Sequence, residues 1–255
     1  MNILAIGDVI GKPGRLAVAR FAREIKREYA VDLTIVNAEN SAGGIGVTPE
    51  TAAELLQAGA DVLTSGNHVW SRKEIIPVLN GDTPLIRPLN YPPGAPGRGY
   101  LVVKEALVVN LIGRTFMGNY DCPFRTMDAL LNGLQDKPRV IIVDFHAEAT
   151  SEKVALGRYL DGRVSAVLGT HTHVGTIDSW VLPNGTAYVT DIGMTGPLNS
   201  IIGDDQDKVL ERFLTQLPNR LTAATGRTVL NAVLVRTDNA TGKATSIQRI
   251  QREAE

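Results

Sequence analysis

The sequence contains one cysteine, Cys122, and four histidines among its 255 residues. A single cysteine cannot close a disulfide within the chain, which excludes a disulfide-stabilised scaffold and is compatible with a reducing compartment. We interpret Cys122 as a small core or near-surface thiol rather than as a catalytic nucleophile.

Long apolar runs and an excess of charge of either sign are also lacking. No stretch of about 18 apolar residues occurs, so the sequence predicts no transmembrane helix. The start, MNILAIGDV, has no basic segment of the kind that opens a signal peptide. With 26 basic and 27 acidic residues the formal net charge is −1, which provides no general attraction to nucleic acid or anionic lipid. We expect a cytoplasmic protein that binds neither a nucleic-acid duplex nor a membrane.

Short apolar runs that alternate with helical patterns are abundant. Strands are predicted at 2–7, 31–37, 61–67, 99–114 (two paired strands), 139–145, 165–170, 228–236 and 244–251, and helices at 14–30, 48–60, 71–79, 123–134, 151–162 and 206–217. Thr48 as a cap and Gly59 as a stop frame the second helix. Residues 180–191 are predicted to form a hairpin with Asn184-Gly185 as a type I′ turn.

This order of elements predicts the fold class. Parallel βα units at the start imply a sheet covered by helices, and the later hairpins imply a second sheet. We therefore expect one α/β domain over residues 1–255, a four-layer α-β-β-α sandwich in which two mixed sheets pack together with helices outside.

Polar side chains recur directly after the apolar strands, where ligands of α/β sheets bind. These side chains are Asp8, Glu39, Asn40, Asn67, His68, His146, His171 and His173, and they include all four histidines of the chain. His171 and His173 are two residues apart, so an extended backbone would aim both rings at one face. Taken one by one, such residues are common as caps, turn formers or core groups, but together they predict a metal site.

The chemistry of this set narrows the kind of metal. Imidazole, carboxylate and amide groups without thiolate suit manganese, iron or zinc, and are too rich in nitrogen for calcium or magnesium. The set also exceeds what one ion with open positions needs. Two ions bridged by a carboxylate fit better, because such a pair clamps a phosphoryl group and activates a bridging hydroxide.

Five sequence blocks resemble those of the calcineurin-like metallophosphoesterases. They are GDVIG (7–11), NAEN (37–40), GNHVW (66–70), DFH (144–146) and GTHTH (169–173), in the order of the family pattern and across most of the chain. Together with GDVIGKPGR and DIGMTGP, the set is similar to the YmdB-like branch of that superfamily. The resemblance implies a bacterial cytoplasmic phosphodiesterase that hydrolyses 2′,3′-cyclic nucleotides at a dinuclear, iron-containing centre, with manganese as the alternative metal.

The resemblance also implies roles for individual residues. Asp8 and His173 would bind the first ion, Glu39 would bridge, and Asn67, His146 and His171 would bind the second. His68 would be the general acid that protonates the leaving oxygen after attack by a metal-bridged hydroxide.

The sequence departs from the superfamily pattern at three points. Ile10 stands where the GD-x-H histidine is expected, and Asn40 is our candidate for the vacant ligand position. The bridging residue is Glu39 rather than aspartate. Val69 follows GNH, so the usual carboxylate partner of the acid histidine is missing and another group must orient His68.

Other expectations stay open. A phosphomonoesterase, a phosphodiesterase for another substrate, and a regulatory nucleotide-binding protein with weak turnover are the alternative functions. Lys12 and Arg15 could contact phosphate or face solvent, whereas Trp70 and Tyr91 could stack on a base, although packing is the commoner role. The Pro/Gly-rich loop at 80–100 could be functional or a plain connection, and its exposed parts, or the C-terminal strands, could support a homo-oligomer.

Overall fold

Alternate residues of strand β1 (Asn2–Ile6) pack into two different hydrophobic cores. Leu4 and Ile6 face the helices of one outer layer, whereas Ile3 and Ala5 face the second sheet. This follows from the two-residue period of a strand, and it shows that β1 is covered on both sides.

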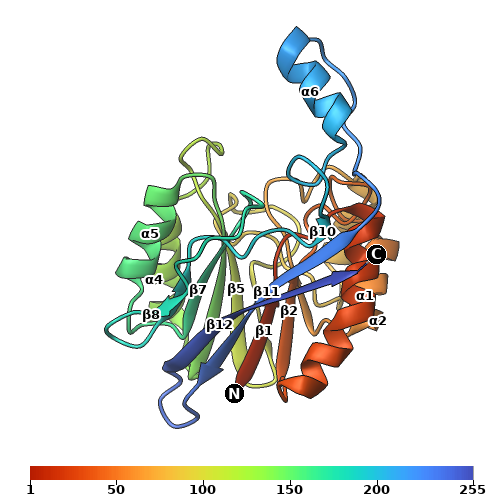
Figure 1. Cartoon of the computed structure of the whole chain (residues 1–255). Helices are drawn as coiled ribbons and strands as arrows, with labels where there is room; N and C mark the ends of the chain where they lie inside the picture. The colour runs from red at the N-terminus through yellow and green to blue at the C-terminus, as the bar shows by residue number, and fades with distance from the viewer. Residues whose placement is uncertain (255) are drawn as a thin grey trace.

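The computed structural model describes residues 1–254, and the strands of this range form two six-stranded sheets (Figure 1). The first has the order β10-β11-β1-β2-β3 with β12 beside β11, and its further strands are β2 (Leu33–Asn37), β3 (Val62–Thr64), β10 (Gly196–Pro197), β11 (Thr228–Thr237) and β12 (Ala244–Ala254). The second has the order β4-β5-β6-β7-β9-β8, with β4 (Tyr100–Val103), β5 (Ala106–Ile112), β6 (Val140–His146), β7 (Ala166–Thr170), β8 (Trp180–Val181) and β9 (Ala187–Val189). β1, β2 and β3 are parallel, as are β5, β6, β7 and β9.

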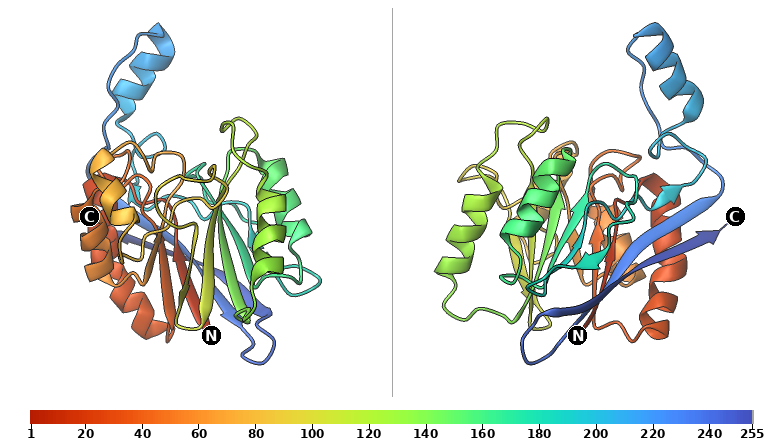
Figure 2. Two further views of the ribbon diagram at one scale, coloured as in Figure 1. Left: turned by 180° about the vertical axis from the view of Figure 1, so that it is seen from behind. Right: turned by 60° about the vertical axis from the view of Figure 1, so that its left-hand side comes forward.

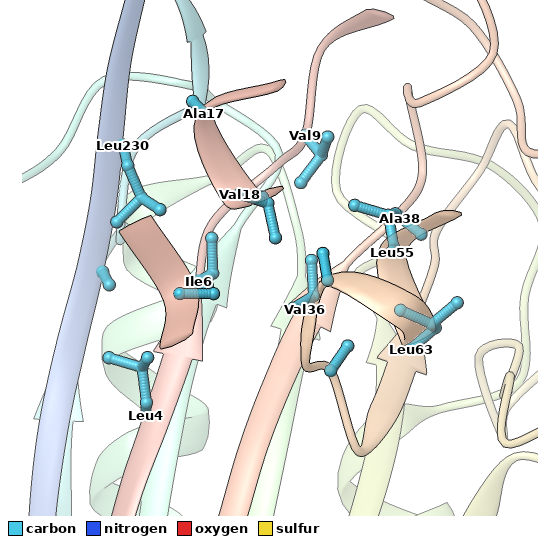
Figure 3. Packing of buried hydrophobic residues seen from close by; sticks show 14 of the residues in the cluster. Leu4, Ile6, Val9, Ala17, Val18, Val36, Ala38, Leu55, Leu63 and Leu230 are labelled. Atoms are coloured by element: carbon cyan, nitrogen blue, oxygen red, sulfur yellow. The ribbon is translucent and has the colours of Figure 1, made fainter. Parts of the chain in front are cut away.

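Helices cover the outer faces of both sheets (Figures 1 and 2). α1 (Gly11–Glu28) and α2 (Pro49–Ala58) lie on the first sheet, and α4 (Pro123–Gly133) and α5 (Thr150–Tyr159) lie on the second. Three hydrophobic clusters fill the three interfaces between these four layers. Figure 3 shows part of the cluster between the first sheet and its helices, where Val18 of α1 and Leu55 of α2 meet side chains of the sheet. The predicted α/β fold with two mixed sheets is confirmed.

Local signals predicted the ends of α2 correctly. The Thr48 side chain accepts a hydrogen bond from the backbone N–H of Thr51, and the Thr51 side chain accepts one from the backbone N–H of Thr48, which forms a capping box. Gly59 ends the helix with φ of 119°, in the left-handed region that glycine adopts without steric cost. Within residues 1–254, no helix combines the length and apolarity needed to cross a bilayer.

Two details of the prediction are wrong. The 180–191 hairpin does not contain a type I′ turn, because that turn needs positive φ at both central residues and only Gly185 has it. The N–H of Gly185 instead bonds the carbonyl of Leu182, so Pro183 and Asn184 are the central residues of the turn. The helix expected at 71–79 is a 3₁₀ turn (Lys73–Ile75) followed by the single-turn helix α3 (Ile76–Leu79).

The segment between β10 and β11 forms an arm that we define as residues 198–222. Its helix α6 (Gln206–Thr215) projects beyond the edge of the sheets (Figures 1 and 2). Val209 is its one buried residue, whereas Leu210, Phe213 and Leu214 are exposed. The sequence predicted the helix but contained no sign that it stands away from the core.

Candidate metal centre

The eight side chains selected from the sequence all lie at the carboxyl ends of strands of both sheets. Asp8 follows β1, Glu39 and Asn40 follow β2, Asn67 and His68 follow β3, His146 ends β6, and His171 and His173 follow β7. The structure brings these residues together at one edge of the sheets, where short contacts join the side chains of all of them except His68, whose backbone N–H bonds Glu39.

His146 lies at the middle of the network, and Thr170 fixes the orientation of its ring through Nδ1. Thr170 Oγ1 donates a hydrogen bond to Asp144 Oδ1 at 2.7 Å, so it can only accept from His146 Nδ1, which lies 3.0 Å away. The proton of the neutral ring is therefore on Nδ1 and the lone pair is on Nε2. Burial lowers the pKa of His146 to about 3, which keeps the ring neutral near pH 7.

The free Nε2 of His146 faces other acceptor atoms. Asn67 Oδ1 lies 3.1 Å away, and Glu39 Oε2 lies 3.2 Å away. His171 Nδ1 is at 3.0 Å, close to the spacing of neighbouring nitrogen ligands that each lie about 2.1 Å from one ion. Because His171 Nε2 donates to Glu148 Oε2, its Nδ1 presents a lone pair, and lone pairs gathered in this way repel each other unless a cation lies among them.

His171 and His173 reach the site by a different backbone from the one expected. Their φ angles are 96° and 67°, so both residues are left-handed and the extended-strand expectation is wrong. The N–H of His171 donates to Asp8 Oδ2 at 3.1 Å, which contributes to holding this conformation. The two rings diverge, because His171 lies against His146 while His173 Nε2 lies 3.3 Å from Asn40 Nδ2 and 3.9 Å from Asp8 Oδ1.

The rings of His171 and His173 each contact a further group through the nitrogen that points away from the site. His173 Nδ1 lies 2.6 Å from the carbonyl of Ile202, to which it donates, so its Nε2 presents a lone pair to the site. His171 Nε2 lies 3.0 Å from Glu148 Oε2. Burial, with His146 next to it, lowers the pKa of His171 to about 4.

The Glu39 carboxylate contacts two other residues of the site. Its Oε1 accepts the backbone N–H of His68 at 2.7 Å, and its Oε2 is directed at His146. Gly66 leaves room for this arrangement, since a methyl group there would collide with the Glu39 carboxylate and the His146 ring. The glycine of the GNH block is thus required by packing within the site.

The carboxylates of Asp8 and Glu39 lack cationic side-chain partners among residues 1–254. Asp8 Oδ1 and Glu39 Oε2 are fully buried and receive no hydrogen bond from that part of the chain. Burial raises the pKa of both groups, because it removes the water that would stabilise the ionised form. Buried carboxylates of this kind are normally paired with a cation or a metal.

The unpartnered carboxylates and unprotonated imidazole nitrogens fit metal ions, although the side chains are not arranged in a coordination geometry. Within residues 1–254, no group of three His, Cys, Asp or Glu side chains is arranged to hold an ion as it stands. His146 and His171 contact each other directly, with His171 Nδ1 3.0 Å from His146 Nε2. Unpartnered carboxylate oxygens next to unprotonated nitrogens are the donor set that a transition metal takes.

A buried ion pair supports the loop that contains His171 and His173. Lys153 Nζ lies 2.7 Å from Asp191 Oδ2, and the same oxygen accepts the N–H and the hydroxyl of Thr172 at 3.1 and 2.7 Å. Asp191 Oδ1 accepts the N–H of Gly193 at 2.8 Å. Asp191 is the first residue of the DIGMTGP block, so that block anchors the loop that carries His171 and His173.

The site opens into a cavity of about 640 Å³. Its walls include His68 and the two histidines of the loop, and the arm supplies Arg212 and Arg220. Sequence reasoning missed the groups that orient or surround the ligands, which are Thr170, Asp144, Lys153, Asp191, Glu148, Arg212 and Arg220. Of these, only Thr170, Asp144 and Asp191 lie in blocks that the sequence had marked.

The structure also shows the surroundings of the residues whose roles the sequence left undecided. Arg15 bonds Glu54 and the Ser41 carbonyl at 2.5 Å each, so its guanidinium is occupied away from the cavity. Lys12 lines other surface hollows. Trp70 and Tyr91 pack edge to face with ring centroids 5.5 Å apart, which is the packing role. Cys122 is half-buried and precedes α4.

The chain is similar to a known protein family over most of its length. The profile of the YmdB-like protein family matches residues 4–250. The chain belongs to the YmdB-like family. A relative from Bacillus subtilis (strain 168), named 2′,3′-cyclic-nucleotide 2′-phosphodiesterase, is 49% identical over 254 residues, which cover 98% of this chain and 96% of the relative.

Solved structures share the fold at full length. A protein from Thermus thermophilus has a TM-score of 0.94 and 45% identity, with 100% of both chains covered. A phosphatase from Mycoplasma pneumoniae has a TM-score of 0.94 and 33% identity, with 99% of this chain and 93% of that one covered. The family and enzyme class predicted from the sequence are confirmed: this YmdB-like protein is a hydrolase of phosphoric ester bonds.

Proposed function

We propose that this YmdB-like protein hydrolyses 2′,3′-cyclic nucleoside monophosphates at a pair of transition-metal ions. The observation that carries the proposal is the cluster around His146 Nε2, where two oxygens and a nitrogen of other residues lie within 3.2 Å of an unprotonated nitrogen. The name of the Bacillus subtilis relative supports the choice of substrate.

Each half of the network supplies ligands for one ion. Asp8 and His173 would hold the first, and Asn40 would complete it in place of the histidine that Ile10 replaces. Asn67, His146 and His171 would hold the second, with the Glu39 carboxylate shared between both. Asn40 presents Nδ2 to His173, so ligation requires its amide to turn over and offer Oδ1.

Bound ions would supply Lewis acidity and would activate a water molecule. The chain's own residues supply the rest. Glu39 and Asp8 offset the charge of the ions, and Thr170 and the Ile202 carbonyl keep the rings of His146 and His173 in the tautomer that presents Nε2.

His68 is the group that would protonate the departing ribose oxygen. It is half-buried on the cavity wall, and its backbone is fixed by the bond from its N–H to Glu39. That bond ties the backbone position of the proposed acid to the proposed bridging carboxylate. A proton donated to the leaving alkoxide contributes about 10²–10⁴-fold to turnover.

We propose iron as the native metal and manganese as the ion that can replace it, since imidazole and carboxylate ligands accept both. The test is a substrate panel on freshly purified protein whose metal content has been measured. The proposal expects 2′,3′-cyclic nucleotides to have a higher kcat/KM than 3′,5′-cyclic nucleotides and phosphomonoesters. A preference for monoesters would favour a phosphatase, and binding without hydrolysis of any of them would favour a regulatory protein.

A further inference from the structure

The cavity beside the candidate metal centre has two arginines on one wall. Arg212 lies in α6 and Arg220 lies on the return segment of the arm, so both come from residues 198–222. Within residues 1–254, they are the only Lys or Arg side chains that line this cavity.

Neither arginine is engaged elsewhere in the described chain. Arg212 and Arg220 are exposed, and their guanidinium groups make no ion pair or hydrogen bond among residues 1–254. Arginines near the site but outside the cavity do have partners, because Arg72 bonds the Ala42 and Ile45 carbonyls and Arg15 bonds Glu54. Two free guanidinium groups on one wall favour an anionic ligand, since this planar group matches phosphate.

The acids on the same cavity wall do not neutralise them. Glu148 is paired with His171 at 3.0 Å. Asp204, in the first part of the arm, is the one acidic side chain that the arm contributes to the cavity lining, against the two arginines. The charged side chains that the arm places on the cavity therefore leave an excess of one positive charge.

The number of phosphate groups in the substrate bears on what the two arginines could bind. A 2′,3′-cyclic mononucleotide has one phosphate, and under the proposed function the metal centre takes it. The two arginines line the same cavity, so they are available to a part of the ligand beyond that phosphate. The cavity of about 640 Å³ lies within the usual range for sites that bind ligands larger than one ring.

We infer that Arg212 and Arg220 form a second phosphate subsite, and that the preferred substrates have a further phosphate on the 5′ side of the ribose whose 2′,3′-cyclic phosphate is cleaved. This inference rests on the proposed function. Two sources share the chemistry: a mononucleotide with a 5′-phosphate, and the last residue of a short RNA, whose 5′ oxygen is part of a phosphodiester.

The experiment compares three substrates under one set of conditions at low ionic strength. They are adenosine 2′,3′-cyclic phosphate, its 5′-phosphorylated form, and an ApA dinucleotide that ends in a 2′,3′-cyclic phosphate. The readout is the ratio of kcat/KM for each phosphate-extended substrate to that for the plain cyclic nucleotide. We expect a ratio of about ten or more for at least one of them, because charge-assisted hydrogen bonds to phosphate are strong. The extended substrate with the higher ratio identifies the source.

Variants of the two arginines test whether the arm causes the preference for phosphate-extended substrates. The double variant Arg212→Gln with Arg220→Gln should bring the ratio close to one, and the double lysine variant should keep part of it because the charge remains. Arg125→Gln is the matched control, since Arg125 is an exposed arginine of α4 outside the cavity, and it should keep the wild-type ratio. Added salt should lower the ratio of the wild type through screening.

Each result decides the question. A ratio near one in the wild type, with plain 2′,3′-cyclic nucleotide hydrolysed, overturns the subsite and leaves the proposed function standing. A high ratio that survives in the double glutamine variant also overturns it. If the wild type hydrolyses none of the three substrates, the proposed function is wrong and the subsite falls with it.

Discussion

Lys153 Nζ lies 2.7 Å from Asp191 Oδ2, and both side chains are excluded from solvent. The pair lies beneath Thr172, which sits between two predicted metal ligands and donates twice to the same carboxylate oxygen. Residues 153 and 191 thus connect α5 and the DIGMTGP block to the loop that carries His171 and His173. The ion pair stabilises the fold and the candidate metal centre together.

Replacing one member of this pair should be costly. Lys153→Ala leaves the Asp191 carboxylate buried without its cation, so we expect a loss of about 3–5 kcal/mol in the free energy of unfolding. Urea denaturation measures it. Arg163→Ala is the control, because the Arg163–Asp128 pair is partly exposed and should lose about 1 kcal/mol or less. Equal losses in the two variants would contradict the structural role given to Lys153.

Thr170→Val should weaken metal binding rather than folding alone. The change removes the hydroxyl that accepts from His146 Nδ1 and donates to Asp144, so the ring loses the bond that fixes its tautomer. We expect metal affinity to fall about 10–100-fold, as measured by competition with a chelator. Thr186→Val is matched in chemistry and burial, but the Thr186 hydroxyl bonds only the 160–164 region, so that variant should keep wild-type affinity.

Gly66→Ala should empty the centre. Its methyl group would overlap the Glu39 carboxylate and the His146 ring, which are backed by buried structure and cannot both move away. Elemental analysis should find most of the bound metal gone. Gly133→Ala, at the end of α4 where an added methyl meets nothing within 4 Å, should retain it. Full metal content in the Gly66 variant would show that the space is not needed.

His68→Gln should separate metal binding from turnover. In the proposed mechanism His68 gives a proton to the leaving oxygen, and no imidazole nitrogen of His68 takes part in the ligand network. We expect metal content to stay at the wild-type level while kcat falls about 10²–10⁴-fold. Loss of metal along with activity would make His68 a ligand, and unchanged kcat would remove it from the reaction.

Local chemistry explains which parts of this structure could be predicted from the sequence. Thr48 and Gly59 framed α2 because a capping side chain and a left-handed glycine act over three or four residues. The ligand candidates were found because parallel strands deliver their ends to one edge, whatever the connections between them. The Asn184-Gly185 turn was misassigned because the Leu182–Gly185 hydrogen bond sets a different turn from the one that the dipeptide favours.

Other features depend on contacts between distant parts of the chain. The left-handed backbone at His171 and His173 is held by Asp8 and Asp191, which are far away in sequence. Thr170 and Lys153 matter through bonds that exist only when β6, β7 and α5 are packed. Arg212 and Arg220 lie in a segment that has no recognisable motif, and only the course of the arm brings them to the cavity.

Under the proposed function, the residues from Asp8 to His173 at this sheet edge hold a pair of metal ions that the phosphodiesterase reaction requires. The most direct measurement is the metal content of protein purified without chelators, followed by hydrolysis of 2′,3′-cyclic AMP before and after the metal is stripped and restored. We expect about two iron or manganese ions per chain, loss of hydrolysis when the metal is stripped, and recovery when either metal is restored. Hydrolysis that continues in fully metal-free protein would contradict it.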